Sequence, residues 1–518
     1  MNIGFVSIYA YRPHVENLFY LSEVISKGGH QASFFVCDAS VPKCYSQLLK
    51  GHAKWRECPV CMLGGFRSYP ARTIYGIEHK FKANLSIQLL ENIAKSSAYT
   101  INRIETPEDC TSEDVLQTQE QLYDSVQVIY GNVINWINNY GIDGILCFNG
   151  RMALTRAVTF ACEQLKVPYV TVERTLFGPG LTLIPNANCL SLKEFDEFNK
   201  KFSQFPLKSL QAQLAAKFAA LRFLKQNVLE WRLYNSDAIH VEWPLLENKS
   251  PKVIILPSSR HEFAGHKNFF CEWESITDAI DEILACLDIS HSNCILRCHP
   301  NWAENIGVNT GYRSERYYTS WASRNGVYCI RSLEKADTYH LMHQADIIIV
   351  NGSSCGFEGG ILGKKVICIG AARYQEAGFT YQIRRKSELS RLKLLDQHDE
   401  KATVRKTLRF IYTCAYRIAQ YTRYVSPRST TRYHYHQGAS SDPIVKMLST
   451  GVLPANDPEV ADDSFEEDIM VEAILSQQWA KLASLEISEE ELPYQQVNRR
   501  LGLRWIDNLR DKFPRGDQ

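Results

Sequence analysis

The chain has 518 residues, of which 45% are hydrophobic and 22% are charged, and its formal net charge is +1. This length predicts two compact domains with a smaller appendage, and the balanced charge argues against a general nucleic-acid-binding protein. No apolar run approaches the roughly 20 residues of a membrane-spanning helix, and Met1 leads into the first strand without a signal-peptide pattern. Sixteen cysteines in such a chain fit a reducing compartment, so we expect a cytoplasmic protein.

The first elements alternate between strand and helix. Residues 3–8 and 32–36 are predicted strands, and the helix between them, over 15–26, ends at Gly28-Gly29. This order is typical of a doubly wound α/β domain. No GxGxxG motif follows the first strand, so we expect no nicotinamide or flavin site.

Four cysteines come next, at Cys37, Cys44, Cys58 and Cys61, the last two in a Cys-Pro-Val-Cys sequence that we place in a loop. A CxxC loop can supply two tetrahedral thiolate ligands, and the other two cysteines would complete a structural zinc site. The alternative is a set of buried thiols without a metal ion. A catalytic dithiol is not favoured, because no thioredoxin-like pattern surrounds the motif.

Two later strands of this half, 144–148 and 169–172, are followed by polar residues. The residues at these strand ends are Asn149, Arg151, Glu173 and Arg174. Ligands of open α/β sheets bind outside the carboxyl ends of the strands, so all four are candidate ligand-binding residues. The alternative is that Arg151 and Glu173 form a structural ion pair.

The second half of the chain repeats the alternation. Predicted strands cover residues 252–256, 293–296, 325–330, 347–350 and 366–369, and predicted helices cover 276–287, 338–344 and 356–362. The continuous apolar run over 347–350 is typical of a strand that is buried on both faces of a parallel sheet. We therefore expect a second Rossmann-like domain.

Three polar loops follow strands of this second domain. They hold Ser258-Ser259, Arg297 with His299, and Ser353-Ser354. The last pair stands at the start of a predicted helix, where free backbone N–H groups and the helix dipole attract anions. Hydroxyls, a guanidinium and an imidazole at one sheet edge suit a phosphate group. The alternative is that the serines only cap their helix.

These motifs resemble the capsule-polysaccharide-synthesis superfamily of bacterial glycosyltransferases, which includes the β-Kdo transferases. The resemblance rests on Arg297-x-His299-Pro300, on Ser353-Ser354-x-Gly356-Phe357-Glu358, and on the downstream runs Gly363-Lys364-Lys365-Val366 and Arg373-Tyr374-x-x-x-Gly378-Phe379-Thr380. It is strong over residues 140–385. It implies the GT-B fold, in which two Rossmann-like α/β domains face each other across a cleft and the second domain holds a nucleotide-sugar.

The resemblance also implies roles for single residues. His299, Ser353 and Ser354 would hold the phosphate of a CMP-sugar, a protonated His299 would stabilise the departing CMP, and Glu358 would bind the ribose or the cytosine. Glu173 would be the catalytic base or nucleophile, with Asp237 as the second candidate. No cofactor would be required for catalysis. The reaction implied moves a Kdo-like ulosonic acid from a CMP-activated donor to a bacterial surface glycan or glycolipid.

Two other functions stay open from the sequence, a CDP-alcohol glycerophosphotransferase and a non-catalytic GT-B-like scaffold that binds glycans. The predicted regions are an acceptor-side domain over 1–245, a nucleotide-sugar domain over 246–390, closing helices over 391–450, and an acidic linker with a helical tail over 451–518. The tail from Asn498 is basic and amphipathic. It could rest on the inner face of a membrane or on a partner, but we favour docking onto its own chain.

Overall fold

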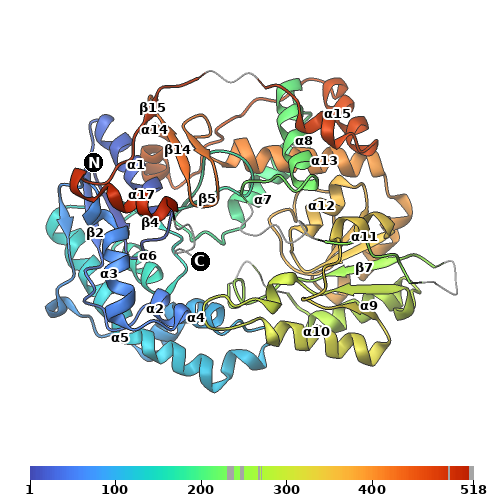
Figure 1. Ribbon diagram of the computed structural model, residues 1–518, viewed down its shortest axis with the longest axis horizontal. Helices are drawn as coiled ribbons and strands as arrows, with labels where there is room; N and C mark the ends of the chain where they lie inside the picture. The colour runs from blue at the N-terminus through green and yellow to red at the C-terminus, as the bar shows by residue number, and fades with distance from the viewer. Residues whose placement is uncertain (230–237, 245–249, 267–268, 270, 488–490, 513–518) are drawn as a thin grey trace.

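The computed structural model describes residues 1–229, 238–244, 250–266, 269, 271–487 and 491–512. Figure 1 shows two α/β domains side by side, the N-terminal one on the left and the C-terminal one on the right, with further helices along the top. Among the described residues, none of the helices combines the length and the apolar character needed to cross a membrane.

The N-terminal domain is built on a sheet with the strand order β3-β2-β1-β4-β5-β6. Its strands are β1 (Asn2–Ser7), β2 (Gln31–Val36), β3 (Ile74–Tyr75), β4 (Gly144–Phe148), β5 (Tyr169–Arg174) and β6 (Leu181–Pro185). All neighbours are parallel except β5 and β6. Every residue of β4 is buried, as expected for a central strand of a sheet that is covered on both faces.

The C-terminal domain has a parallel sheet with the order β12-β11-β10-β7-β8-β9. Its strands are β7 (Val253–Leu256), β8 (Cys294–Arg297), β9 (Tyr328–Ile330), β10 (Ile347–Val350), β11 (Lys365–Cys368) and β12 (Tyr381–Gln382). Each sheet thus starts in its middle and grows first to one side and then to the other. The switch points, between β1 and β4 and between β7 and β10, are the places where such sheets bind ligands.

The helices of the two domains follow the predicted pattern in most places. They are α1 (His14–Lys27), α2 (Tyr45–Lys50), α3 (Lys54–Gly64), α4 (Ile87–Ile101), α5 (Glu113–Tyr140) and α6 (Ala153–Leu165), and then α9 (Ile276–Cys286), α10 (Tyr312–Asn325), α11 (Thr338–Gln344) and α12 (Cys355–Ile361). The CxxC sequence lies on α3 and not in a loop, and α4 was not predicted.

The closing helices are α7 (Lys193–Phe202), α8 (Ser209–Phe223), α13 (Glu400–Tyr412), α14 (Asp442–Thr450), α15 (Phe465–Leu475), α16 (Trp479–Ala483) and α17 (Trp505–Lys512). We expected α7 and α8 to belong to the N-terminal domain, but α8 packs against α13, α15 and α16 along the top of Figure 1. The reason is the buried alanine face of α8, from Ala212 to Ala220, because small side chains let neighbouring helices approach closely.

A small antiparallel sheet returns the chain to the N-terminal domain. It consists of β13 (Val425–Pro427), β14 (Tyr433–His436) and β15 (Tyr494–Gln495). The hydroxyl of Tyr435 donates to the side-chain oxygen of Asn17 at 2.8 Å, and that of Tyr20 donates to the carbonyl of His436 at 2.8 Å. The α/β class with two Rossmann-like domains and closing C-terminal helices, the GT-B arrangement, is therefore confirmed.

The turn after β10 yields a first prediction. Gly352 has a φ of +100°, and a Cβ there would lie 2.6 Å from the carbonyl oxygen of Ala371. Because this backbone conformation strains every residue with a Cβ, Gly352→Ala should lower the free energy of unfolding by at least about 1–2 kcal/mol. Thermal denaturation measures the change. Gly502→Ala, where a Cβ meets nothing within 4 Å, is the control, and equal melting temperatures for both variants would contradict the prediction.

Candidate functional site

Strand ends of the N-terminal domain converge on the carboxylate of Glu173, the penultimate residue of β5. Asn149 Nδ2, just after β4, donates to Glu173 Oε2 at 3.1 Å, and the backbone N–H of Arg174 donates to Oε1 at 3.0 Å. His14, which follows β1 and begins α1, places its Nε2 3.4 Å from Oε1. The structure thus brings the predicted Asn149 and Glu173 together and adds a histidine.

His14 was missed in the sequence analysis, although the rule that found Asn149 applies to it as well, since it also follows a strand end. Its ring packs on Phe148 with the centroids 4.0 Å apart. Burial lowers the pKa of His14 from its ordinary value of 6.5 to about 4. The imidazole is therefore neutral at pH 7, with its Nε2 beside the Glu173 carboxylate.

The carboxyl of Glu173 is ionised at pH 7. Burial alone would raise its pKa, but His14, Arg174 and the amide of Asn149 outweigh this effect, so the pKa of Glu173 lies below its ordinary value. A carboxylate that is stabilised in this way is a weak base. The geometry therefore suits stabilisation of a positive charge, or nucleophilic attack, better than the removal of a proton.

Arg151 is held by the helix that the sequence analysis did not predict. Its Nη1 donates to Ser96 Oγ at 3.0 Å and to Thr100 Oγ1 at 2.9 Å, both on α4. Burial by itself would lower the pKa of Arg151. Nearby negative charges, of which Glu262 in the C-terminal domain has the largest effect, outweigh burial, so the pKa is raised. Arg151 therefore does not form the ion pair with Glu173 that we considered, and its guanidinium is held by α4 instead.

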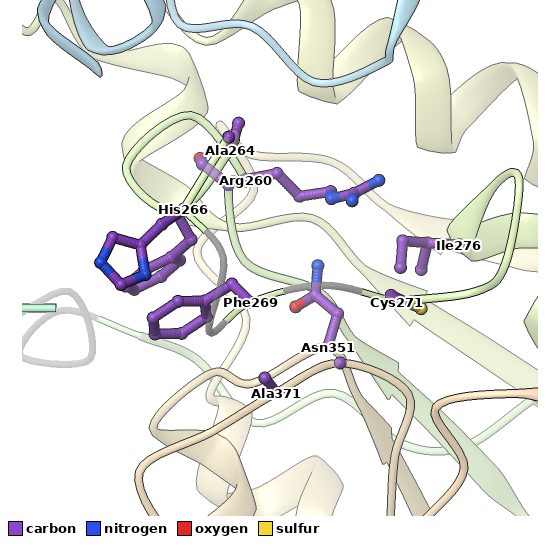
Figure 2. A pocket seen from close by; sticks show the side chains of 12 residues that line it. Arg260, Ala264, His266, Phe269, Cys271, Ile276, Asn351 and Ala371 are labelled. Atoms are coloured by element: carbon purple, nitrogen blue, oxygen red, sulfur yellow. The ribbon is translucent and has the colours of Figure 1, made fainter. Parts of the chain in front are cut away.

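A pocket of about 330 Å³ lies at the carboxyl ends of β7 and β10. Figure 2 shows Arg260 and Asn351 on opposite sides of it, with His266 and Phe269 at one end. The ring of Phe263 stacks on Phe269 with the centroids 4.3 Å apart. Stacked aromatic rings beside a guanidinium suit a ligand with a flat base and an anionic group. The sequence analysis missed these residues, although Arg260 directly follows the predicted Ser258-Ser259.

The two serines after β7 have different uses. Ser258 donates to the side-chain oxygen of Asn351 from its backbone N–H at 2.7 Å and from its hydroxyl at 3.1 Å, and Asn351 Nδ2 donates back to the Ser258 carbonyl at 2.8 Å. Ser259 Oγ accepts a hydrogen bond from Trp302 Nε1 at 2.6 Å and lines the pocket. A hydroxyl that accepts in this way keeps its own hydrogen for a ligand.

The Ser353-Ser354 pair divides in the same way. Ser353 is buried and donates to the carbonyl of Leu256 at 3.1 Å, which ties β10 to β7. Ser354, at the N-cap of α12, is exposed, and its side chain caps no backbone N–H. Ser354 therefore does not act as the helix cap that we considered. Of the two hydroxyls, that of Ser354 is the one accessible to a ligand.

Arg297 and His299 differ from their expected states. Arg297 donates from Nη1 and Nη2 to the carbonyls of Cys298, Arg331 and Glu334, so its guanidinium orders the segment after β9. His299 Nδ1 accepts from the N–H of Asn301 at 3.2 Å. Burial, and next the charge of Arg297, lower the pKa of His299 to about 4. The expectation of a protonated His299 is therefore wrong for the protein without bound phosphate, because desolvation disfavours the cation.

The remaining predicted carboxylates are placed as follows. Glu358 is buried and forms an ion pair with Arg222 of α8 at 2.5 Å, which joins α12 to the closing helices. A ribose or a cytosine would have to share this carboxylate with Arg222. Asp237, the second catalytic candidate, lies outside the described residues.

The cysteine group shows no metal-binding geometry. Cys58 accepts a hydrogen bond from Gln47, and Cys61 donates to the carbonyl of Ile8 at 3.7 Å. Burial raises the pKa of Cys37 to about 12 and that of Cys61 to about 11, and it also raises the pKa of Cys44. Within the described part of the chain, no group of three or more His, Cys, Asp or Glu side chains could hold a metal ion. The geometry therefore favours separate thiols over a structural zinc site.

Residues 218–424 match the family described as "Capsule polysaccharide biosynthesis protein". This segment contains the motifs of the C-terminal domain, from Ser258 to Glu358, so the resemblance is confirmed there. No curated protein sequence matches the chain significantly.

Several solved structures are similar to the chain. KpsC of Thermosulfurimonas dismutans matches in its β-Kdo 2,4 transferase (17% identity, 64% of this chain, 88% of that chain, TM-score 0.31) and in its β-Kdo 2,7 transferase (13%, 61%, 88%, 0.34). UDP-GlcNAc 2-epimerase from Neisseria meningitidis bound to UDP-GlcNAc matches with 14% identity over 80% of this chain and 96% of that chain, at a TM-score of 0.27.

The buried His14 yields a second prediction. Because its folded pKa is depressed to about 4 from 6.5, the unfolded chain takes up a proton at this site first as the pH falls through this window, and the folded state loses stability. His14→Gln removes that contribution. The stability advantage of the wild type over the variant should shrink by up to about 1.4 kcal/mol per pH unit over this window. Urea unfolding between about pH 7 and pH 4 tests this, with His30→Gln as the control. A difference that is independent of pH would refute it.

Proposed function

We propose that this chain is a glycosyltransferase that moves a sugar from a CMP-activated donor to a bacterial surface glycan or glycolipid. The observation that carries the proposal is the pairing of two sites, one at the switch point of the C-terminal sheet and one beside the switch point of the N-terminal sheet. One is the aromatic and basic pocket beside β7 and β10, and the other is the ionised Glu173 at the end of β5. The match of residues 218–424 to capsule polysaccharide biosynthesis proteins supports it.

The donor nucleotide would occupy the C-terminal pocket. Its base would lie against Phe263 and Phe269, and its phosphate would meet Arg260 and the hydroxyl of Ser259. Ser354 and the neutral His299 are further candidate donors to the same phosphate. These groups are protein side chains, so the proposal requires no metal ion to bind the phosphate.

The sugar would point from this pocket towards the N-terminal domain. When CMP departs with its bonding electron pair, positive charge develops at the anomeric carbon of the sugar. Glu173 would stabilise this charge, or attack the carbon if the configuration is retained, while Asn149 and His14 hold its two oxygens. The acceptor hydroxyl then forms the new bond to the anomeric carbon, and its proton passes to an oxygen of the departing CMP phosphate.

A ulosonic acid such as Kdo is the sugar that we favour, because it carries a carboxylate on the reacting carbon. Two arginines of the N-terminal domain, Arg151 and Arg174, stand near the strand ends that hold Glu173 and supply positive charge for such a carboxylate. The pKa of Arg151 is raised by neighbouring negative charge, so its guanidinium remains charged. A neutral hexose has no carboxylate that could pair with these arginines.

Nucleotide selectivity provides a third prediction. CMP at about 100 times its Kd should stabilise the folded protein by about 2.7 kcal/mol, seen as a rise in melting temperature, and UDP and GDP should have smaller effects. Phe263→Ala should reduce the shift because the base loses its stacking partner. Phe465→Ala, at a side chain that is 70% exposed on α15, should leave it unchanged.

Each other outcome of that experiment has a definite meaning. A shift with UDP or GDP alone would remove CMP as the nucleotide and keep a transferase. A shift with CDP and CDP-alcohols alone would favour the glycerophosphotransferase. No shift with any nucleotide would favour the non-catalytic scaffold.

Turnover provides a fourth prediction. Glu173→Gln keeps the shape of the side chain and removes its charge, so turnover of CMP-Kdo with cell-derived acceptors should fall by about 10²–10⁴-fold. Glu163→Gln is the matched control, since Glu163 pairs with Arg156 on the outer part of α6. An unchanged CMP-induced thermal shift in Glu173→Gln shows that the fold and the nucleotide site are intact. Turnover at the wild-type rate would remove Glu173 from the mechanism.

A further inference from the structure

A surface patch formed by α3 and the C-terminal segment is not explained by the proposed transferase site. We call it the α3–tail patch and define it as residues 54–72 with 499–509. Its large hydrophobic side chains are exposed, namely Trp55 (79%), Val60 and Leu63 on α3 and Leu501 (80%), Trp505 (58%) and Leu509 on the tail. Tryptophan rarely remains this exposed without a partner surface.

Hydrogen bonds hold the two parts of the patch together. Arg499 donates to the carbonyl of Leu63 and forms an ion pair with Asp507 at 2.8 Å, and the backbone N–H of Arg500 donates to the carbonyl of Ser68 at 2.8 Å. Arg12 of the N-terminal domain pairs with Asp507 as well. The expected docking of the tail onto its own chain is therefore confirmed, beside α3 in Figure 1.

This docking decides which face of the tail is turned outward. Ile506 is buried against the protein, whereas Leu501, Trp505 and Leu509 are exposed. Trp505 and Leu509 are four residues apart on α17, so they lie on one face of this helix, and Leu501 lies in the short 3-10 turn that precedes it. The docked tail thus keeps an apolar stripe that no described residue covers.

The charge around this stripe is positive. The patch contains the basic residues Lys54, Arg56, Arg67, Arg72, Arg499, Arg500 and Arg504, and all but Arg499 are exposed. Its acidic residues are Glu57 and Asp507. Glu57 is buried and bonded to Lys50 and His52, and Asp507 is paired with two arginines. For a chain with a formal net charge of +1, this is a strong local excess of exposed positive charge.

We propose that the α3–tail patch docks the protein onto an anionic lipid surface. Interfacial helices combine an apolar stripe that enters the headgroup region with flanking Lys and Arg that attract anionic lipids, and tryptophan favours the level of the headgroups. A protein partner would have to supply both an apolar groove for the stripe and carboxylates for the exposed basic side chains, whereas an anionic bilayer offers an apolar interior and a negatively charged surface together. The inference does not rest on the proposed transferase activity.

Vesicle binding tests this proposal. The full chain should sediment with vesicles of phosphatidylcholine mixed with phosphatidylglycerol about tenfold more than with phosphatidylcholine alone, and added salt should weaken binding. The double variant Leu501→Ser, Trp505→Ser should lose about tenfold in binding. Its control is Leu333→Ser, at a leucine that is 81% exposed outside the patch. Arg56→Glu with Arg504→Glu should also weaken binding, and Lys393→Glu, at an exposed lysine outside the patch, should not.

Three results would overturn the proposal. The first is equal vesicle binding by the wild type and the Leu501→Ser, Trp505→Ser variant. The second is no binding by the wild type at physiological salt. The third is a wild type that does not bind vesicles but forms a concentration-dependent dimer, seen by light scattering, that this variant abolishes, since the patch would then bind a second copy of the chain. The substituted side chains are exposed, so an unchanged melting temperature confirms that each variant is folded.

Discussion

The structure of the C-terminal domain depends on the way in which Asn351 joins the ends of β7 and β10. Beyond a strand end the backbone groups lose their ladder partners and need new ones. The amide of Asn351 takes over this task, since its oxygen accepts from Ser258 N–H and its nitrogen donates to the Ser258 carbonyl. This holds the two strand ends together at the switch point. Arg260, Phe263 and Ser354 lie on the segments that follow these two strand ends.

Buried polar contacts join the N-terminal domain to the C-terminal domain, and the C-terminal domain to the closing helices. Arg103, after α4, donates to the carbonyls of Asn301 and Glu304 in the other domain. Its neighbour Glu105 bonds to Ser314, and burial raises the pKa of Glu105 to about 7. Near the closing helices, Arg222 meets Glu358. These contacts help to hold the two α/β domains and the closing helices in place relative to one another.

Polar residues of the motifs serve either the fold or a ligand. The side chains of Ser258, Ser353 and Arg297 donate hydrogen bonds to backbone carbonyls or to the side chain of Asn351. Ser259 and Ser354 keep a hydroxyl that a ligand can use. Each of the motifs that were predicted to bind a ligand therefore contains residues that stabilise the backbone, and in two of them a neighbouring residue is left to bind the ligand. This division is expected because buried polar groups must be satisfied before any is left for a ligand.

The sequence by itself determined the two α/β domains, because buried parallel strands leave continuous apolar runs such as 347–350, and it determined that polar residues follow the strand ends. Only the tertiary structure decided which of these residues meet. His14 reaches Glu173 through the placement of α1, and Arg151 turns to α4. The tertiary structure also decided the protonation states of His14 and His299, because the desolvation of a side chain depends on neighbours that are distant in the chain. The same holds for the tail, whose docking through Arg499 and Asp507 decides which face is exposed.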